Sequence, residues 1–254
     1  MEHGADAPAV VLSPHLDDAV LSAWAVLTGP GEVAVVNVFA GLPAPGPPRR
    51  CDLLVRAGDS RALVEARRAE DREALARAGR FPLNLDFLDE QYRFVDPEPA
   101  ELAAALAAHV PRAAALYAPA GIRRHRDHEI VRDLALRVGR QAGIPVLLYA
   151  DLPYAVHYGW PAWVTDGEAD DSLDPEVDWE LALATADVDR EHLVARAIRL
   201  DAETAEAKLR ALACYRSQFS LLNRGPLGLI DHPRVLPFEV EWAVDGDRER
   251  ERVS

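Results

Sequence analysis

Short apolar runs alternate with longer amphipathic segments over the first 150 residues of the chain. Five of the runs have the length of buried strands, at 9–12, 33–40, 85–88, 114–117 and 145–150. Segments with helical periodicity separate them, at 17–27, 59–79, 99–109 and 127–141. Because strands that alternate with helices form βαβ units, the pattern predicts a Rossmann-like, doubly wound α/β fold with a mostly parallel sheet in the order 3-2-1-4-5.

The alternation stops at about residue 151. Aromatic residues crowd 154–163, an acidic run follows, 201–217 has the pattern of another helix, and 247–254 has the composition of a frayed tail. We therefore expect a single α/β domain over 1–254. Residues 1–150 would form its core, and residues 151–254 would form a C-terminal extension that completes the substrate pocket.

Composition excludes several classes of partner and location. The chain has 254 residues and a net charge of −14, which argues against nucleic acid and anionic membranes because their phosphates would be repelled. Cys51 and Cys214 are too few for a disulfide framework or a four-thiolate zinc site. The N-terminal residues lack the pattern of a secretion signal and no apolar window approaches a membrane span, so we expect a cytoplasmic protein. No pattern predicts an oligomeric state.

Two short polar segments carry the candidate chemistry. His15-Leu16-Asp17-Asp18 follows the first predicted strand, and His125-Arg126-Asp127-His128 follows the fourth. Strands 1 and 4 are neighbours in a 3-2-1-4-5 sheet, and ligands bind where their carboxyl ends meet. The spacing of three residues between His15 and Asp18 predicts that both lie on one face of an incipient helical turn.

This collection of histidines and aspartates is sufficient for a catalytic zinc site, which needs three protein ligands and an open position. His15, Asp18 and His128 supply two imidazoles and one carboxylate. Asp17 is then a candidate general base, and His125 is a candidate acid or oxyanion stabiliser. Asp127 would orient a histidine from behind. The alternative is that Asp17, Asp18 or Asp127 merely caps a helix.

The sequence resembles the PIG-L/LmbE-like zinc-dependent N-acetylglucosaminyl deacetylase superfamily. Its hallmarks, His-Pro-Asp-Asp and His-x-Asp-His, are similar to His15-Leu16-Asp17-Asp18 and His125-Arg126-Asp127-His128. Arg67-x-x-Glu70 and the segment from Lys208 to Gln218 are similar to two further family helices. The chain departs from the family at Leu16, Ala19 and Arg123-Arg124, which replace a proline, an acidic residue, and a glycine or aromatic residue.

The resemblance implies a role for each matching position. His15, Asp18 and His128 would bind Zn²⁺, and Asp17 would be the general base. His125 would stabilise the oxyanion or protonate the leaving amine. Arg67 would contact the substrate, and Asp89 would accept a substrate hydroxyl. The implied reaction removes an acyl group, usually acetyl, from an N-acylated amino sugar or glycoconjugate.

Other functions fit parts of the pattern. The ligand set also accepts Fe²⁺ or Co²⁺. A non-sugar amide, such as an amino-acid or thiol conjugate, would need the same residues. Two-metal phosphoester hydrolysis would need more bridging carboxylates than these segments supply. A non-catalytic Rossmann-like binding module is the remaining alternative, although no Gly-x-Gly-x-x-Gly follows the first strand.

Overall fold

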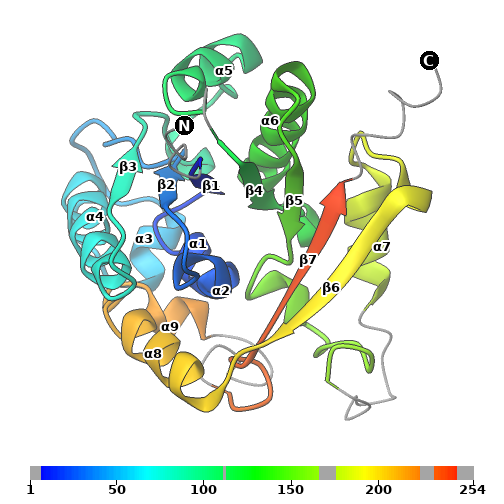
Figure 1. The fold of residues 1–254 in the computed structure, drawn as a ribbon. Helices are drawn as coiled ribbons and strands as arrows, with labels where there is room; N and C mark the ends of the chain where they lie inside the picture. Colours follow the sequence, from blue (N-terminus) through cyan, green and yellow to red (C-terminus); the bar gives the residue numbers. More distant parts are fainter. Residues whose placement is uncertain (1–6, 111–112, 166–175, 224–231, 245–254) are drawn as a thin grey trace, which may run out of the picture.

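A mixed seven-stranded sheet forms the centre of the protein, in the order β3-β2-β1-β4-β5-β7-β6 (Figure 1). The computed structural model describes residues 7–110, 113–165, 176–223 and 232–244. Neighbours among the first five strands are parallel and lie in the predicted order, so the predicted fold class is confirmed. The strands are β1 (Ala9–Ser13), β2 (Val33–Asn37), β3 (Pro82–Asn84), β4 (Ala115–Pro119), β5 (Val146–Tyr149), β6 (Leu193–Arg199) and β7 (Phe238–Val244).

The C-terminal extension continues this sheet instead of standing beside it. Strand β7 pairs antiparallel with β5, and β6 pairs antiparallel with β7. The sequence analysis missed both strands. Residues 238–242 of β7 alternate apolar and acidic side chains, and Glu239 and Glu241 are nevertheless buried, while β6 is largely exposed. The alternation could therefore have indicated β7, whereas β6 has no such pattern.

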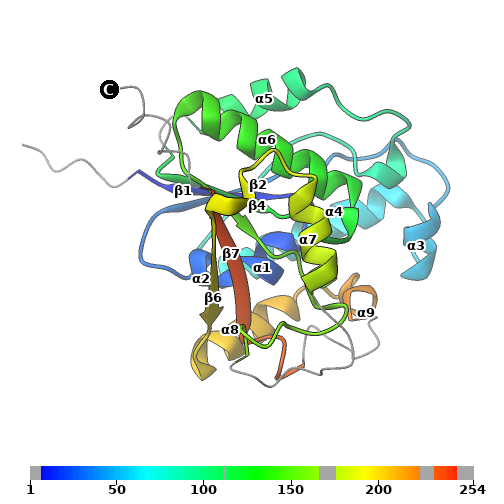
Figure 2. The ribbon, with the colours of Figure 1, turned by 90° about the vertical axis from the view of Figure 1, so that its right-hand side faces the viewer.

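Helices cover both faces of the sheet (Figure 2). In that view α5 and α6 lie above the sheet, and α1, α2 and α8 lie below it. The α-helices are α1 (Asp18–Ser22), α2 (Trp24–Leu27), α3 (Arg50–Leu54), α4 (Ser60–Ala76), α5 (Pro99–Ala107), α6 (Arg126–Ala142), α7 (Glu176–Ala184), α8 (Ala202–Leu212) and α9 (Phe219–Leu222). Short 3₁₀ turns are η1 (Glu90–Tyr92), η2 (Ile122–Arg124), η3 (Tyr154–Val156) and η4 (Arg190–His192). None of the helices in the described part of the chain has the length and hydropathy of a bilayer span.

Several predicted boundaries were wrong. The predicted helix 17–27 is two short helices that break at Ala23, where φ is −135°. The third strand lies at Pro82–Asn84 and not at 85–88, and the helix predicted at 201–217 ends at Leu212. Helices α3, α7 and α9 were not predicted, and the tail at 247–254 lies outside the described residues.

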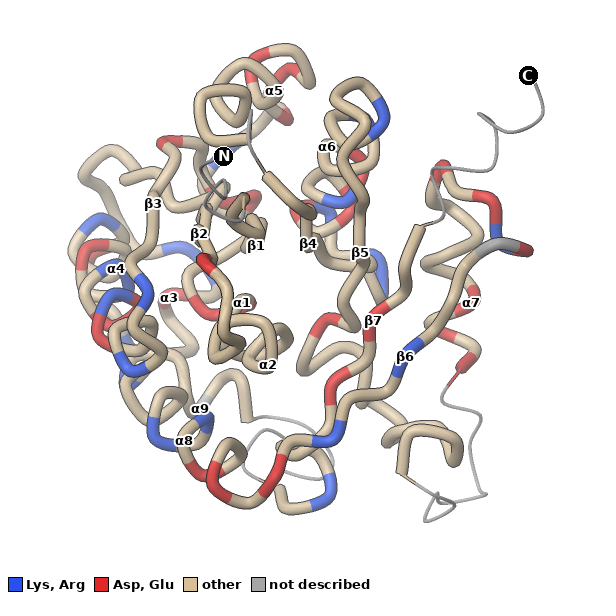
Figure 3. The backbone as a smooth tube through the Cα atoms, viewed as in Figure 1, with Lys and Arg blue, Asp and Glu red and all other residues tan. Residues whose placement is uncertain are grey.

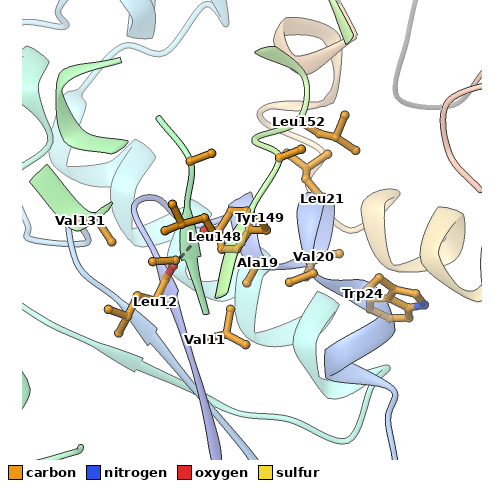
Figure 4. Packing of buried hydrophobic residues seen from close by; sticks show 14 of the residues in the cluster. Val11, Leu12, Ala19, Val20, Leu21, Trp24, Val131, Leu148, Tyr149 and Leu152 are labelled. Atoms are coloured by element: carbon orange, nitrogen blue, oxygen red, sulfur yellow. Dashed lines mark hydrogen bonds between the residues drawn. The ribbon is translucent and has the colours of Figure 1, made fainter. Parts of the chain in front are cut away.

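Local signals explain the elements that were predicted well. The Asp59 side chain accepts a hydrogen bond from the Ala62 N–H at 2.8 Å and so caps the start of α4. Helix α6 ends at Gly143, whose φ of 66° is the left-handed conformation that favours glycine. Strand β1 runs through the core, where the Tyr149 hydroxyl donates to the Leu12 carbonyl oxygen at 2.9 Å (Figure 4).

Charge is distributed unevenly over this fold (Figure 3). Residues 166–191 hold 11 acidic side chains and one basic side chain, and the structure describes this run from Glu176 onward. Helix α7 carries part of this charge at the β6 side of the sheet. The overall charge therefore says little about the carboxyl ends of β1 and β4, where the two polar segments lie.

Candidate active site

The segment after β1 folds into a tight turn that brings His15 against Asp18. Ser13 closes the turn, because its hydroxyl donates to the His15 carbonyl oxygen at 2.7 Å and accepts from the Ala19 N–H at 3.0 Å. The Asp18 carboxylate accepts from the backbone N–H of His15 at 2.8 Å. Helix α1 begins only at Asp18, so the predicted shared helical turn is wrong, although the two side chains do meet.

Asp127 lies directly behind His15. Its Oδ2 is 2.9 Å from His15 Nε2 and accepts the Glu90 N–H at 3.0 Å, while its Oδ1 forms an ion pair with Arg93. Burial raises the pKa of Asp127, but His15 and Arg93 outweigh it and hold the pKa well below its usual value. Asp127 is therefore an ionised acceptor. In the neutral form of His15, Asp127 therefore keeps the proton on Nε2 and leaves a lone pair on Nδ1.

His128 is oriented in the same manner by a different carboxylate. Its Nδ1 is 3.1 Å from Asp151 Oδ1, and Asp151 Oδ2 accepts the Ile122 N–H at 2.6 Å. With its proton on Nδ1, His128 has a lone pair on Nε2. That atom is buried, has no hydrogen-bond partner among the described residues, and lies 3.4 Å from Asp18 Oδ2. An orphaned, buried imidazole nitrogen beside a carboxylate is the arrangement expected of a metal ligand.

Three donor atoms converge on one point: His15 Nδ1, Asp18 Oδ2 and His128 Nε2. The Asp18 oxygen is 3.3 Å from the His15 nitrogen and 3.4 Å from the His128 nitrogen, and all three side chains are buried. Two ligands of a tetrahedral ion at 2.0–2.1 Å lie about 3.3 Å apart. The two separations from Asp18 therefore match an ion of the size of zinc, and all three donor atoms lie within 4.8 Å of one another.

Asp17 and Arg67 form a second charged pair in the same pocket. Asp17 precedes α1 but makes no side-chain cap, so the capping alternative is wrong for this residue. Its Oδ2 lies 3.5 Å from Nη2 of Arg67, which projects from α4. Burial raises the pKa of Asp17, and Arg67 opposes that rise. The result is a buried carboxylate that is more basic than an exposed aspartate.

His125 lies beside the donor set but outside it. Its ring centroid is 5.0 Å from that of His15, 4.9 Å from that of His128 and 5.7 Å from that of Tyr154. Burial and the two neighbouring histidines lower the pKa of His125 to about 3. Its imidazole is therefore neutral near pH 7 and offers one N–H donor.

These side chains line a pocket with a cavity volume of about 150 Å³. Asp89 is part of its wall, where it lies 3.8 Å from His15 Nε2 and caps η1 by accepting the Gln91 N–H at 3.0 Å. The described residues that line the pocket are His15, Asp17, Asp18, Cys51, Asp52, Leu63, Arg67, Asp89, Glu90, Gln91, His125, Pro153, Tyr154, Gln218, Leu221 and Leu222. The lining thus includes five carboxylates and, among these described residues, a single arginine.

Arg123 and Arg124 directly precede the second polar segment and are not among the described residues that line this pocket. Arg123 pairs with Asp178 of α7 at 2.6 Å, and Arg124 pairs with Glu129 at 3.2 Å. The arginines near the predicted site in the sequence predict basic surroundings, but among the described residues that line the pocket Arg67 is the one arginine, so this prediction is wrong. Arg123 and Arg124 instead have φ values of 61° and 59°, the left-handed region that favours glycine.

Three functional neighbours escaped the sequence analysis. Asp151 directly follows β5, whose carboxyl end adjoins that of β4, so the sheet order could have indicated it. Glu90 and Arg93 lie in a loop whose path depends on tertiary packing, and no local pattern marked them. The aromatic residues at 154–163 have different surroundings. Tyr154 lines the pocket, whereas Trp160 is buried in the core.

The two further segments of family resemblance, Arg67-x-x-Glu70 and Lys208 to Gln218, contact each other. Glu70 of α4 accepts hydrogen bonds from the Ser217 hydroxyl at 2.7 Å and from the Ser217 N–H at 3.1 Å. This contact fixes the chain after α8 beside α4, and Gln218 then reaches the pocket wall. Lys208 of the same motif is fully buried and donates to Glu239 of β7 at 2.6 Å. The late motif therefore joins the extension to the core.

Three solved structures are similar to this chain in sequence and in fold. A deacetylase–bog complex from the biosynthesis pathway of teicoplanin is 27% identical, with a TM-score of 0.71, over 94% of this chain and 98% of that chain. The A40926 pseudoaglycone deacetylase Dbv21 is 27% identical, with a TM-score of 0.69, over 95% and 98%. The zinc-inhibited form of teicoplanin deacetylase Orf2 is 26% identical, with a TM-score of 0.69, over 94% and 98%.

No curated protein sequence matches the chain. The PIG-L family model, described as GlcNAc-PI de-N-acetylase, matches residues 10–138. That match contains both polar segments and the helix that carries Arg67. It spans just over half of the sequence, and the chain therefore belongs to the PIG-L family.

Proposed function

We propose that this protein is a zinc-dependent N-deacylase that removes an acyl group, acetyl in the first instance, from an N-acylated amino sugar or glycoconjugate. His15, Asp18 and His128 would hold the metal. The observation that carries the proposal is the buried Nε2 of His128, which faces Asp18 while Asp151 holds the proton on Nδ1. Fe²⁺ and Co²⁺ also suit two imidazoles and a carboxylate.

Asp17 has the position and basicity of the general base. A zinc ion in the donor set would supply Lewis acidity, which polarises an amide carbonyl and acidifies water. Asp17 would accept the proton that the attacking water loses, and Arg67 at 3.5 Å keeps the carboxylate ionised until then. The protonated Asp17 would afterwards return this proton to the leaving nitrogen, which departs as a free amine.

His125 would stabilise the charge that develops on the amide oxygen. Of the two roles that the sequence leaves open, the pKa of about 3 favours a neutral hydrogen-bond donor over a proton donor. Its buried Nδ1 has no hydrogen-bond partner in the described part of the chain, so this nitrogen is available to a substrate. A donor aimed at a developing oxyanion is worth about 3–4 kcal/mol in the transition state.

The size of the pocket favours a substrate of which only one part enters. A volume of about 150 Å³ accommodates an acylamino group and the adjoining ring, so the remainder of a glycoconjugate would lie outside. Asp89 would accept a sugar hydroxyl at the wall, and Arg67 would contact the substrate from α4. The teicoplanin and A40926 pseudoaglycone deacetylases named above support a glycopeptide-like conjugate as the first substrate class to test.

The deciding experiment combines metal analysis with acetate release. Protein purified without chelator is expected to hold one equivalent of metal and to release acetate from at least one member of a panel of N-acetylated sugars, glycosides and glycopeptides. One equivalent of metal without acetate from any of them would indicate a non-sugar amide. Protein that binds no added zinc would refute the metal-dependent mechanism.

Asp17→Asn tests the base separately from the metal site. The variant is expected to retain one equivalent of zinc and to lose about 100-fold or more in kcat, which is the usual contribution of a general base. His128→Ala is the matched control, because it is expected to lose the metal itself. An Asp17→Asn enzyme with the wild-type kcat would show that another group accepts the proton.

A further inference from the structure

Two potential sets of metal ligands overlap at His15. The first consists of His15, Asp18 and His128, and the second consists of His15, His125 and Asp127. A neutral imidazole has one lone pair, so His15 can serve the first set through Nδ1 or the second through Nε2, but not both. The nitrogen of His15 that faces a hydrogen-bond acceptor, and not the metal, therefore decides which set is complete.

Whether Asp127 acts as a hydrogen-bond acceptor or as a metal ligand determines which nitrogen of His15 is available to the metal. As a hydrogen-bond acceptor, 2.9 Å from Nε2, it holds the proton there and leaves Nδ1 free for the first set. As a metal ligand, it would instead complete the second set with His125, whose Nδ1 is buried without a hydrogen-bond partner among the described residues. A further contact must therefore hold the Asp127 carboxylate as a hydrogen-bond acceptor for His15.

Arg93 is positioned to do so. Its Nη2 forms the ion pair with Oδ1 of Asp127, so only Oδ2 faces His15 and the Glu90 N–H. The guanidinium is itself fixed from several sides. It donates to the Leu88 carbonyl oxygen at 2.8 Å and to Asp96 at 2.8 Å, and it lies over the Phe39 ring at 4.7 Å.

The burial of Arg93 strengthens this restraint. Its side chain is 8% exposed and that of Asp127 is 0% exposed, so water cannot readily replace either partner. A guanidinium is planar and always charged, so it binds a carboxylate in a fixed orientation. A more flexible cation would not fix that orientation. Loss of Arg93 would leave a buried carboxylate in need of a cation.

We propose that Arg93 is a positioning residue that selects the ligand set, by holding Asp127 as an acceptor for His15 and preventing it from binding the metal with His125. This inference rests on the proposed metal site. It assigns no chemical step to Arg93, which acts only through Asp127 and His15. Without Arg93, metal would bind partly or wholly at the second set and would engage His125.

The test measures how far metal binding depends on His125. Zinc stoichiometry and affinity are determined by competition with a chelating dye, and the visible spectrum is recorded on the cobalt-loaded protein. Each measurement is made with and without His125→Ala, in the wild type and in Arg93→Gln. Arg126→Gln is the matched control, because Arg126 also contacts Asp96 at 2.8 Å but is exposed and pairs with no residue of either ligand set.

In the wild type and in Arg126→Gln, His125→Ala is expected to change zinc affinity by less than about twofold. In Arg93→Gln it is expected to lower affinity by about tenfold or more and to alter the cobalt spectrum, in line with the usual weight of such supporting contacts. Equal and small effects of His125→Ala in both backgrounds would overturn the proposal. Wild-type protein that binds no metal would instead refute the metal site proposed above.

Arg93→Lys keeps the test decisive if Arg93→Gln does not fold. A lysine restores the charge but not the planar fork, so it should hold Asp127 less firmly. We expect His125→Ala to lower zinc affinity in this background by an intermediate factor, about threefold or more. If the Arg93→Lys background were as insensitive to His125→Ala as the wild type, Arg93 would not select the ligand set.

Discussion

Asp127 accepts a hydrogen bond from Nε2 of His15 at 2.9 Å, across 112 positions of the sequence. Asp151 holds Nδ1 of His128 at 3.1 Å in a corresponding way. Each histidine therefore has a carboxylate that fixes its tautomer and directs its remaining lone pair toward Asp18. Two independent restraints on one donor set favour a single metal geometry.

Replacement of either carboxylate by its amide should weaken metal binding. We expect Asp127→Asn and Asp151→Asn each to lower zinc affinity by about 10–100-fold, because an amide is a weaker acceptor and does not stabilise the donor imidazole. Competition with a chelating dye measures the change. Asp133→Asn, an exposed position on α6, is the control, and an effect no larger than that of the control would exclude an orienting role.

The left-handed backbone at Arg124 predicts that glycine stabilises this position more than alanine does, which is the reverse of the order within a helix. Both Arg124→Gly and Arg124→Ala remove the contact with Glu129, so their difference isolates the φ of 59°. We expect the glycine variant to have a free energy of unfolding about 1–2 kcal/mol higher than the alanine variant. At exposed Arg137 within α6 the order should reverse by about 1 kcal/mol. Urea unfolding measures both pairs, and the same order at both positions would contradict the backbone assignment.

Asp71 predicts a pH-dependent stability. Burial raises its pKa to about 7, against the lowering effect of hydrogen bonds from Tyr215 and Asn37. The folded protein therefore binds more protons than the unfolded chain between about pH 4 and pH 7. The stability that Asp71 contributes is complete below its unfolded pKa and falls as pH rises through this window, by up to about 1.4 kcal/mol per unit.

Asp71→Asn should remove this slope, because an amide does not titrate. Urea unfolding of the wild type and the variant at pH 4.5, 6 and 8 gives the difference directly. We expect the variant to gain stability relative to the wild type as pH rises and then to level off above pH 7. A difference that is flat with pH would show that Asp71 titrates alike in the folded and unfolded states.

The buried pair between Lys208 and Glu239 predicts a large loss of stability. Lys208→Met leaves the Glu239 carboxylate without its cation, although it still accepts the N–H groups of Trp24 and Ala25 at 2.9 and 3.0 Å. We expect a loss of about 3–5 kcal/mol in the free energy of unfolding. Adding Glu239→Gln should recover part of the loss, because it removes the unpaired charge and keeps an acceptor. No recovery would indicate that packing around Lys208 dominates.

The sequence predicted the parallel core and the meeting of the two polar segments because both depend on local patterns and a general rule of sheet topology. It located His15, Asp18 and His128 without showing how each is oriented. Glu90 and Arg93 could not be anticipated, because they reach Asp127 through a loop with no periodic pattern. Strand β7 could have been predicted from its alternating pattern, but the burial of Glu239 and Glu241 could not, because it depends on partners elsewhere in the chain.

The pairing of β5 with β7 limits how this protein can be divided. A fragment that ended at residue 150 would lose Asp151 and would expose the edge of β5, which β7 covers in the intact chain. Exchange of the C-terminal part between relatives would carry the same risk, since Glu239 holds the start of α2. Grafting new specificity onto this scaffold is therefore better attempted in the pocket wall than by substitution of the whole extension.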